Sequence, residues 1–140
     1  MYLIFDTETT GLPRNWKAPL TDFSNWPRCV QLAWQVHDIE GKLMEVKNFI
    51  IKPESYDIPF NAEKIHGIST DLANKKGMPL AQVLLEFVKD VEKCKFVIGH
   101  NVSFDNSIVG CELLRKDMSN ILDEFPALDT KDDSTNFCAI

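Results

Sequence analysis

The chain has 140 residues and a mass of 16.0 kDa, which is the size of one domain. Its 21 acidic and 15 basic residues give a formal net charge of −6 at pH 7. This charge argues against a protein that coats nucleic acid through a broad basic face, since such binding depends on neutralising phosphates. It does not exclude an enzyme that grips a few nucleotides at a metal site, because a metal site is itself a cluster of acidic side chains.

Apolar runs and cysteines narrow the class further. No apolar run is long enough to span a membrane, and the N-terminal segment has neither the basic leader nor the apolar length of a signal peptide. The cysteines contain no C-x-x-C pair, which argues against a zinc ribbon or a disulfide framework. They are Cys29, Cys94, Cys111 and Cys138. We expect them to act as small apolar residues in a cytoplasmic protein.

Strand-like runs dominate the first part of the chain. A short apolar run over residues 2–7 predicts a buried first strand. The runs over residues 29–39 and 42–51 predict two further strands that flank a turn at Glu40-Gly41. Three consecutive strands of this kind are typical of an antiparallel meander.

A long loop is expected over residues 12–27, where prolines and polar residues interrupt any apolar pattern. It contains Trp16 and Trp26. We expect both indoles to pack the loop onto the domain, and stacking on a substrate strand is the alternative.

Helices and short strands alternate in the rest of the chain. A short helix is expected near residues 61–66, where Gly67 would end it, and an amphipathic helix is expected to begin at Pro79. The remaining elements, in order, are a buried strand over 95–99, a helix over 102–116 and a last strand near 125–129. We therefore predict an α/β fold in which helices flank a mixed five-stranded sheet, with functional groups at the strand ends.

Two carboxylates end the first predicted strand, in the sequence F-D-T-E-T-T-G (residues 5–11). Asp6 and Glu8 are two residues apart, so a strand places them on the same face. Such a pair repels unless a cation lies between its members, and oxygen ligands suit Mg²⁺ or Mn²⁺ better than zinc. For a D-x-E pair alone, however, a solvated strand end is the favoured interpretation.

A second polar cluster, V-I-G-H-N-V-S-F-D (residues 97–105), follows the fourth predicted strand. Asn101 and Asp105 are four residues apart and share one face of the helix that begins there. Their ordinary interpretation is structural: Asn101 caps the helix and Asp105 complements the positive end of its dipole. Taken alone, this cluster favours neither a structural nor a functional role.

Together the two clusters form a recognisable pair. A D-x-E-T-T-G motif that ends the first strand and a later G-H-N-x-x-F-D motif that opens a helix resemble the first two motifs of the DnaQ-like 3′→5′ exonuclease family. The segments W-P-R-C-V-Q (residues 26–31) and A-x-x-I-H-G-I (residues 62–68) resemble further parts of the same family. The likeness covers nearly the whole chain, and the family members it resembles most are of the DNA polymerase III epsilon subunit type.

The resemblance implies a ribonuclease H-like fold and hydrolysis of terminal phosphodiesters with two Mg²⁺ or Mn²⁺ ions. Asp6 would bridge both ions, Glu8 would bind the ion that activates water, and Asp105 would bind the other. The resemblance also implies a set of residues around the 3′-terminal nucleotide. They are Thr7, Thr9, Leu12, Ile65, His66, Asn101 and Phe104.

One part of the family pattern is missing. In the histidine branch of the family, a third motif, His-x-x-x-x-Asp, supplies the general base and a fourth carboxylate. The sequence has three histidines, and none follows Asp105. The segment Phe125-x-x-x-Asp129 only faintly resembles the alternative Tyr-x-x-x-Asp form, because phenylalanine lacks the hydroxyl that orients water. We therefore expect residues 1–140 to form a single domain that is shortened at its C-terminal end and lacks the last helix.

Two functions follow as hypotheses. The first is a metal-dependent 3′→5′ exonuclease, severely impaired in this chain by the missing third motif. The second is a non-catalytic relative that binds nucleic-acid 3′ ends or a DNA polymerase subunit. DNA is expected as the nucleic acid more than RNA, and the role in proofreading, repair or RNA trimming is open. An apolar strip of sheet left uncovered by the missing helix would favour a dimer.

Overall fold

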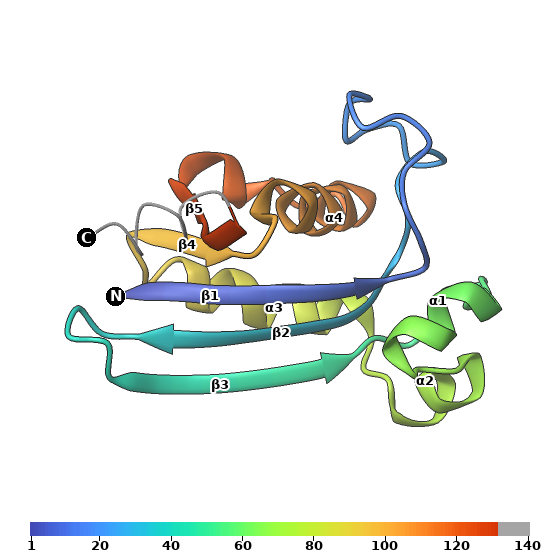
Figure 1. The fold of residues 1–140 in the computed structure, drawn as a ribbon, viewed down its shortest axis with the longest axis horizontal. Coiled ribbons are helices and arrows are strands. Elements are labelled where there is room, and N and C mark those ends of the chain that lie inside the picture. Colours follow the sequence, from blue (N-terminus) through green and yellow to red (C-terminus); the bar gives the residue numbers. More distant parts are fainter. Residues whose placement is uncertain (132–140) are drawn as a thin grey trace.

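A five-stranded sheet is the centre of the computed structural model, which describes residues 1–131 (Figure 1). Its strands follow the spatial order β3-β2-β1-β4-β5. The bounds are β1 Tyr2–Thr9, β2 Cys29–His37, β3 Leu43–Ile50, β4 Phe96–Gly99 and β5 Ala127–Asp129. The first three strands are antiparallel, whereas β4 pairs parallel to β1 and β5 parallel to β4. The predicted mixed five-stranded sheet is therefore confirmed.

Four α-helices and one 3-10 helix accompany the sheet in the described residues. Their bounds are α1 Phe60–His66, α2 Thr70–Lys76, α3 Leu80–Val91, α4 Val102–Arg115 and the 3-10 helix η1 Ile121–Glu124. Helices α3 and α4 lie against the central strands, while α1 and α2 stand together beyond the ends of β1 and β3 (Figure 1). None of the helices within residues 1–131 is long and apolar enough to cross a membrane.

The core lies between the sheet and helices α3 and α4. Alternate residues of β1 and β2, among them Phe5 and Trp34, are buried on this face. The Phe87 ring of α3 packs against both, with ring centroids 5.3 Å from Phe5 and 5.2 Å from Trp34. The same alternation places Thr7 of β1 on the buried face and leaves Asp6 exposed on the opposite one.

The opposite face of the sheet carries exposed apolar side chains. The strand register places Ile4 beside Gln35 and Ile98, and continues the row to Val46 at one side and Leu128 at the other. Ile4, Val46 and Leu128 are 37%, 54% and 46% exposed. Within residues 1–131 these positions thus form an exposed row that is apolar except for Gln35. The expected loss of a C-terminal helix concerns positions outside the described residues.

Helix ends in the central part agree only in part with the sequence. Gly67 ends α1 in the left-handed conformation, at φ 76°, as predicted. Pro79 occupies the N-cap of α3 instead of its first helical position. Helix α2 was not predicted, because its seven residues are too few to show a periodic apolar face. Ser69, whose hydroxyl accepts a hydrogen bond from the Leu72 N–H, was the signal available for it.

The two tryptophans of the long loop between β1 and β2 differ in their exposure. Trp26 is buried, and its indole N–H donates to the Pro19 carbonyl at 3.0 Å. The prediction that it packs the loop onto the domain is therefore confirmed. Trp16 is 54% exposed but contacts the Phe104 ring of α4, with ring centroids 5.5 Å apart, so the same prediction is confirmed only in part for this residue. Of the cysteines, Cys29, Cys94 and Cys111 are buried as expected, and Cys138 lies outside the described residues.

Candidate active site

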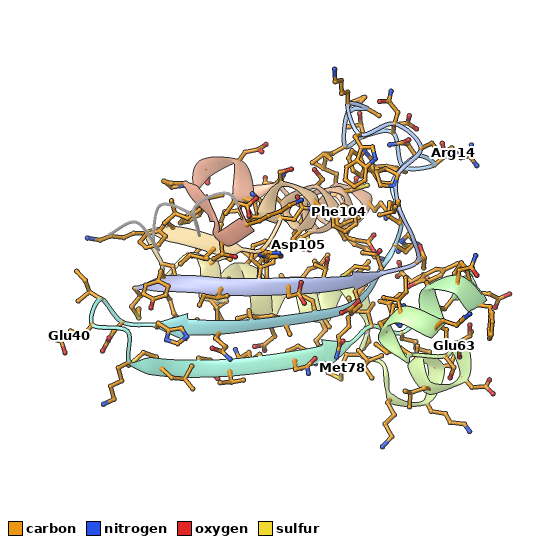
Figure 2. All side chains as sticks on the ribbon, in the orientation of Figure 1. Arg14, Glu40, Glu63, Met78, Phe104 and Asp105 are labelled. Carbon is orange, nitrogen blue, oxygen red and sulfur yellow. The ribbon has the colours of Figure 1, made fainter. Side chains whose placement is uncertain are left out.

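The end of β1 meets the first turn of α4 at a buried hydrogen bond. The Thr7 hydroxyl donates to the Asp105 carboxylate at 2.6 Å, and the two residues are 8% and 3% exposed. Figure 2 shows Asp105 between α4 and β1. The bond joins the two motifs that the sequence placed 98 positions apart. It brings Asp105 next to the strand segment that carries Asp6 and Glu8.

Burial and neighbouring negative charge raise the pKa of two carboxyl groups in this region, Asp105 and Glu8. The pKa of Asp105 is raised to about 7, chiefly by burial; the Thr7 hydrogen bond opposes the rise, and repulsion from Asp6 and Glu8 adds to it. Burial and the charge of Asp6 also raise the pKa of Glu8, while His66 acts in the opposite direction. The negative charge of Asp6 thus contributes to the raised pKa of both Glu8 and Asp105.

The donor chemistry of the three carboxylates fits a hard divalent cation. All their ligand atoms are oxygens, and a cation would relieve both the repulsion and the burial of negative charge. Across residues 1–131, however, no group of three or more histidine, cysteine, aspartate or glutamate side chains is gathered closely enough to hold an ion. The structure thus brings Asp105 beside β1 without forming a closed ligand set.

A pocket of about 460 Å³ opens beside these carboxylates. It includes Glu8 and six of the seven residues expected around a terminal nucleotide. Those six are Thr7, Thr9, Leu12, Ile65, His66 and Phe104. Asn101, Asp6 and Asp105 are not among its lining residues. The sequence analysis missed five lining residues, namely Thr10, Gly11, Pro59, Asn61 and Ala62, of which Thr10 and Gly11 belong to the D-x-E-T-T-G motif.

Two apolar side chains flank the pocket from different segments. Leu12, in the loop after β1, is 72% exposed, and Ile65 of α1 is 84% exposed. Exposed large apolar side chains that gather around one cavity often mark a ligand-binding site. Phe104, from the first turn of α4, provides an aromatic surface at the same pocket. The arrangement suits a flat apolar group that enters between these side chains.

His66 supplies a polar group to the pocket. Its Nδ1 accepts a hydrogen bond from the Ile68 N–H at 3.1 Å, so the neutral ring carries its proton on Nε2. That Nε2 is buried and has no hydrogen-bond partner among residues 1–131. A buried donor without a partner is costly, which favours a ligand oxygen as its acceptor. In this tautomer His66 is a hydrogen-bond donor and cannot act as a base through Nε2.

The N-terminus of α4 is capped by Asp129 and not by Asn101. The Asp129 carboxylate accepts hydrogen bonds from the N–H groups of Asn101 and Val102, at 2.8 and 3.2 Å. Asn101 occupies the N-cap position in the left-handed conformation, at φ 63°, but its side chain makes no capping bond. The predicted N-cap position of Asn101 is therefore confirmed, but its side chain makes no capping hydrogen bond.

A buried carboxylate that the sequence did not reveal holds α4 against the start of β2. Glu112 is fully buried and accepts hydrogen bonds from Arg28 Nε at 3.1 Å, from the Cys29 N–H at 2.9 Å and from Arg115 at 2.6 Å. Arg28 also pairs with Glu54 at 2.8 Å. Glu112 lies two turns beyond Asp105, so this network fixes the helix that carries Asp105. Arg28 lies 84 positions from Glu112 in the sequence, and no short motif marks such a pair.

Comparison with known proteins places these features in context. No protein-family model matches the chain. The DNA polymerase III subunit epsilon of Rickettsia felis is 34% identical over 134 residues, which are 91% of this chain and 52% of that protein. The same subunit of Rickettsia conorii is 34% identical over 115 residues, covering 79% of this chain and 43% of that protein. The chain therefore spans about half the length of these relatives.

Solved structures agree at the level of the fold. Escherichia coli exonuclease I in complex with a dT13 oligonucleotide matches with a TM-score of 0.77 at 24% identity. The match covers 99% of this chain and 29% of that protein. A product-bound structure of exonuclease I also gives a TM-score of 0.77 at 24% identity. Sequence and fold together confirm the resemblance: the chain is a relative of the DnaQ-like exonucleases, similar to the DNA polymerase III epsilon subunits.

Proposed function

We propose that the chain is a metal-dependent 3′→5′ exonuclease domain that removes the terminal nucleotide from single-stranded nucleic acid, with DNA preferred over RNA. The observation that carries the proposal is the pocket lined by Thr7, Glu8 and Phe104, beside the buried Asp105. A terminal nucleotide placed there would bring its phosphate close to the carboxylates of β1. The epsilon-type relatives support a DNA polymerase subunit as a partner.

Asp6, Glu8 and Asp105 would hold the divalent ions. Bound there, the ions would supply Lewis-acid stabilisation of the attacking and leaving oxygens in an in-line displacement. The chain's own residues position the substrate. Leu12 and Ile65 would enclose the terminal base and sugar, since both line the pocket with apolar atoms exposed.

Three polar groups would act on the nucleotide or on the carboxylates. His66 Nε2–H would donate to a phosphate or sugar oxygen, which satisfies its buried proton. Thr7 holds the orientation of Asp105 through its hydroxyl. Asn101 would contact the terminal sugar or phosphate with a side chain that is not used for capping.

A single-stranded oligonucleotide labelled at its 5′ end, incubated with Mn²⁺, tests the proposal. We expect a ladder that shortens from the 3′ end, no degradation of an oligonucleotide with a blocked 3′ terminus, and no activity in Asp6→Asn. Asp57→Asn removes an exposed carboxylate outside the site and should leave the ladder unchanged. Release of internal fragments, or equal activity in Asp6→Asn, would contradict the assignment.

A second candidate is a catalytically impaired relative that binds 3′ ends or a polymerase. It is favoured by one observation: His66, the histidine that lines the pocket, is a hydrogen-bond donor in its neutral form. General-base catalysis typically contributes about 10²–10⁴-fold, so a chain without a base should turn over slowly but still bind. The test compares the turnover of this chain with that of a chain extended to include a His-x-x-x-x-Asp motif. Equal turnover would show that another residue completes the site. Two candidates for this residue, Asp132 and Asp133, lie outside the described residues.

A further inference from the structure

We infer that Trp16 forms a second base-binding site beside the candidate pocket, on which the base of the penultimate nucleotide stacks. This inference rests on the proposed function, because the second site would bind the nucleotide next to the terminal one on the same nucleic-acid strand. Trp16 lies in the loop between β1 and β2, and it is not among the residues that line the pocket.

An aromatic contact links Trp16 to the pocket. Its ring lies 5.5 Å from the ring of Phe104, centroid to centroid, at an interplanar angle of 48°. Phe104 lines the pocket, so the aromatic surface continues from the pocket wall onto the loop. Phe104 lies at the start of α4, beside the buried Asp105 (Figure 2). A strand that leaves the pocket past Phe104 therefore meets Trp16 next.

The indole is exposed although the loop that carries it is firmly held. Asn25, which is 9% exposed, clamps the residue before Trp16: its side-chain oxygen accepts from the Asn15 N–H at 2.8 Å, and its amide donates to the Asn15 carbonyl at 2.9 Å. On the other side, the buried Trp26 is bonded to the Pro19 carbonyl. An aromatic ring that is held in place loses little conformational freedom when a ligand binds. The exposure of Trp16 is thus a fixed feature of the loop.

The surroundings of Trp16 suit a nucleic acid more than an apolar partner. Arg14 and Lys17 are exposed on either side of it, within a chain whose net charge is −6. Cations that alternate with an exposed aromatic ring are the arrangement that tracks a phosphate backbone while bases stack. Arg14 projects from the loop (Figure 2). Because every base has a π face, this second site would accept any base.

Calorimetric titration of the 140-residue chain tests the inference, with Ca²⁺ in place of a catalytic metal. The ligands are thymidine 5′-monophosphate, the dinucleotide pTpT, and the same dinucleotide with an abasic 5′ residue. Stacking on one aromatic ring is expected to make pTpT bind roughly 5- to 150-fold more tightly than the abasic dinucleotide. Trp16→Ala should lose most of this difference and keep its affinity for the monophosphate. Trp16→Phe should retain most of the difference.

Phe60→Ala is the matched control, because Phe60 is a 69% exposed aromatic residue that does not line the pocket. It should bind all three ligands like the unmodified chain. The inference is overturned if Trp16→Ala keeps the preference for pTpT over the abasic ligand, or if it weakens all three ligands equally. Failure of the monophosphate to bind would overturn the proposed function itself. Loss of the pTpT preference with normal monophosphate binding supports both.

Discussion

The buried position of Asp105 disfavours the ionised form of its carboxyl group. It is 3% exposed, and its pKa of about 7 compares with an ordinary value of 3.8. Between these pH values the folded chain holds a proton that the unfolded chain has lost. The contribution of this group to stability is therefore greatest below about pH 4, and it declines as the pH rises to about 7. The loss of stability applies to the chain without a cation, and a cation bound to Asp105 as proposed would offset it.

Asp105→Asn should remove that decline. Without divalent ions, we expect the variant to be more stable than the unmodified chain by a few kcal/mol at pH 8, and similar in stability near pH 4. Urea denaturation in the presence of a chelator, at several pH values, measures the difference. Asp57→Asn should follow the unmodified chain throughout. Parallel stability curves for Asp105→Asn and the unmodified chain would show that burial of Asp105 does not strain the fold.

Glu112 is a buried carboxylate of the opposite kind, because cationic and amide donors satisfy it. Glu112→Gln keeps the shape of the side chain but leaves Arg28 and Arg115 without their shared negative partner. Breaking a buried pair from one side costs about 3–5 kcal/mol. We expect a loss of that order in the free energy of unfolding, measured by urea denaturation. The exposed Glu92→Gln on the C-cap of α3 is the control, and a loss no larger than in that variant would contradict the role of Glu112.

At the scale of elements, the first turn of α4 depends on a residue of β5. Asp129 caps the helix through the N–H groups of Asn101 and Val102. Burial alone would raise the pKa of Asp129, but hydrogen bonds from backbone N–H groups, including these two, outweigh it, so the pKa is lowered. A lowered pKa means that the ionised cap stabilises the fold above the ordinary pKa of an aspartate, and that this stabilisation disappears as the pH falls through the lowered value.

Asp129→Ala should therefore lower the melting temperature at pH 7, and the difference from the unmodified chain should shrink as the pH falls below the ordinary pKa of an aspartate. It should also speed amide exchange in the first turn of α4, where Phe104 and Asp105 lie, with little change in α3. Ser69→Ala removes the corresponding cap of α2 and should affect that helix alone. Uniform faster exchange in both α3 and α4 would show that Asp129 acts on the whole fold instead.

The sequence predicted elements that carry a clear period and missed those that do not. The strands near residues 29–39 and 42–51 alternate over enough positions to be recognised, and α3 shows a continuous apolar face. Helix α2 has only seven residues and one buried side chain, Ala73, so its signal is confined to its cap. The cap of α4 is beyond any local pattern, because Asp129 reaches it from 28 positions away.

At the scale of the whole molecule, the resemblance to the family located the pocket, but it did not give the network that supports it. Six of the seven residues expected to contact a nucleotide line one cavity, because their motifs are short and continuous in the sequence. Glu112 could not be distinguished from an exposed glutamate, since only the folded chain brings Arg28 to it. The packing role predicted for Trp16 holds only in part, because its ring contacts Phe104 but stays 54% exposed while the buried Asn25 also holds the loop.

Divalent ions should stabilise the whole chain if the three carboxylates bind them. A ligand that binds only the folded state at 100 times its dissociation constant adds about 2.7 kcal/mol, which for a domain of this size is roughly 5–10 °C in melting temperature. We expect Mn²⁺ to produce such a rise at pH 8, where Asp105 is ionised even without the metal, and to produce less at pH 5.5, where protons compete for its carboxylate. Thermal melts with matched ionic strength measure it. Asp6→Asn should lose most of the rise, while Asp57→Asn should retain it. An equal rise in Asp6→Asn would place the bound ion elsewhere on this acidic chain.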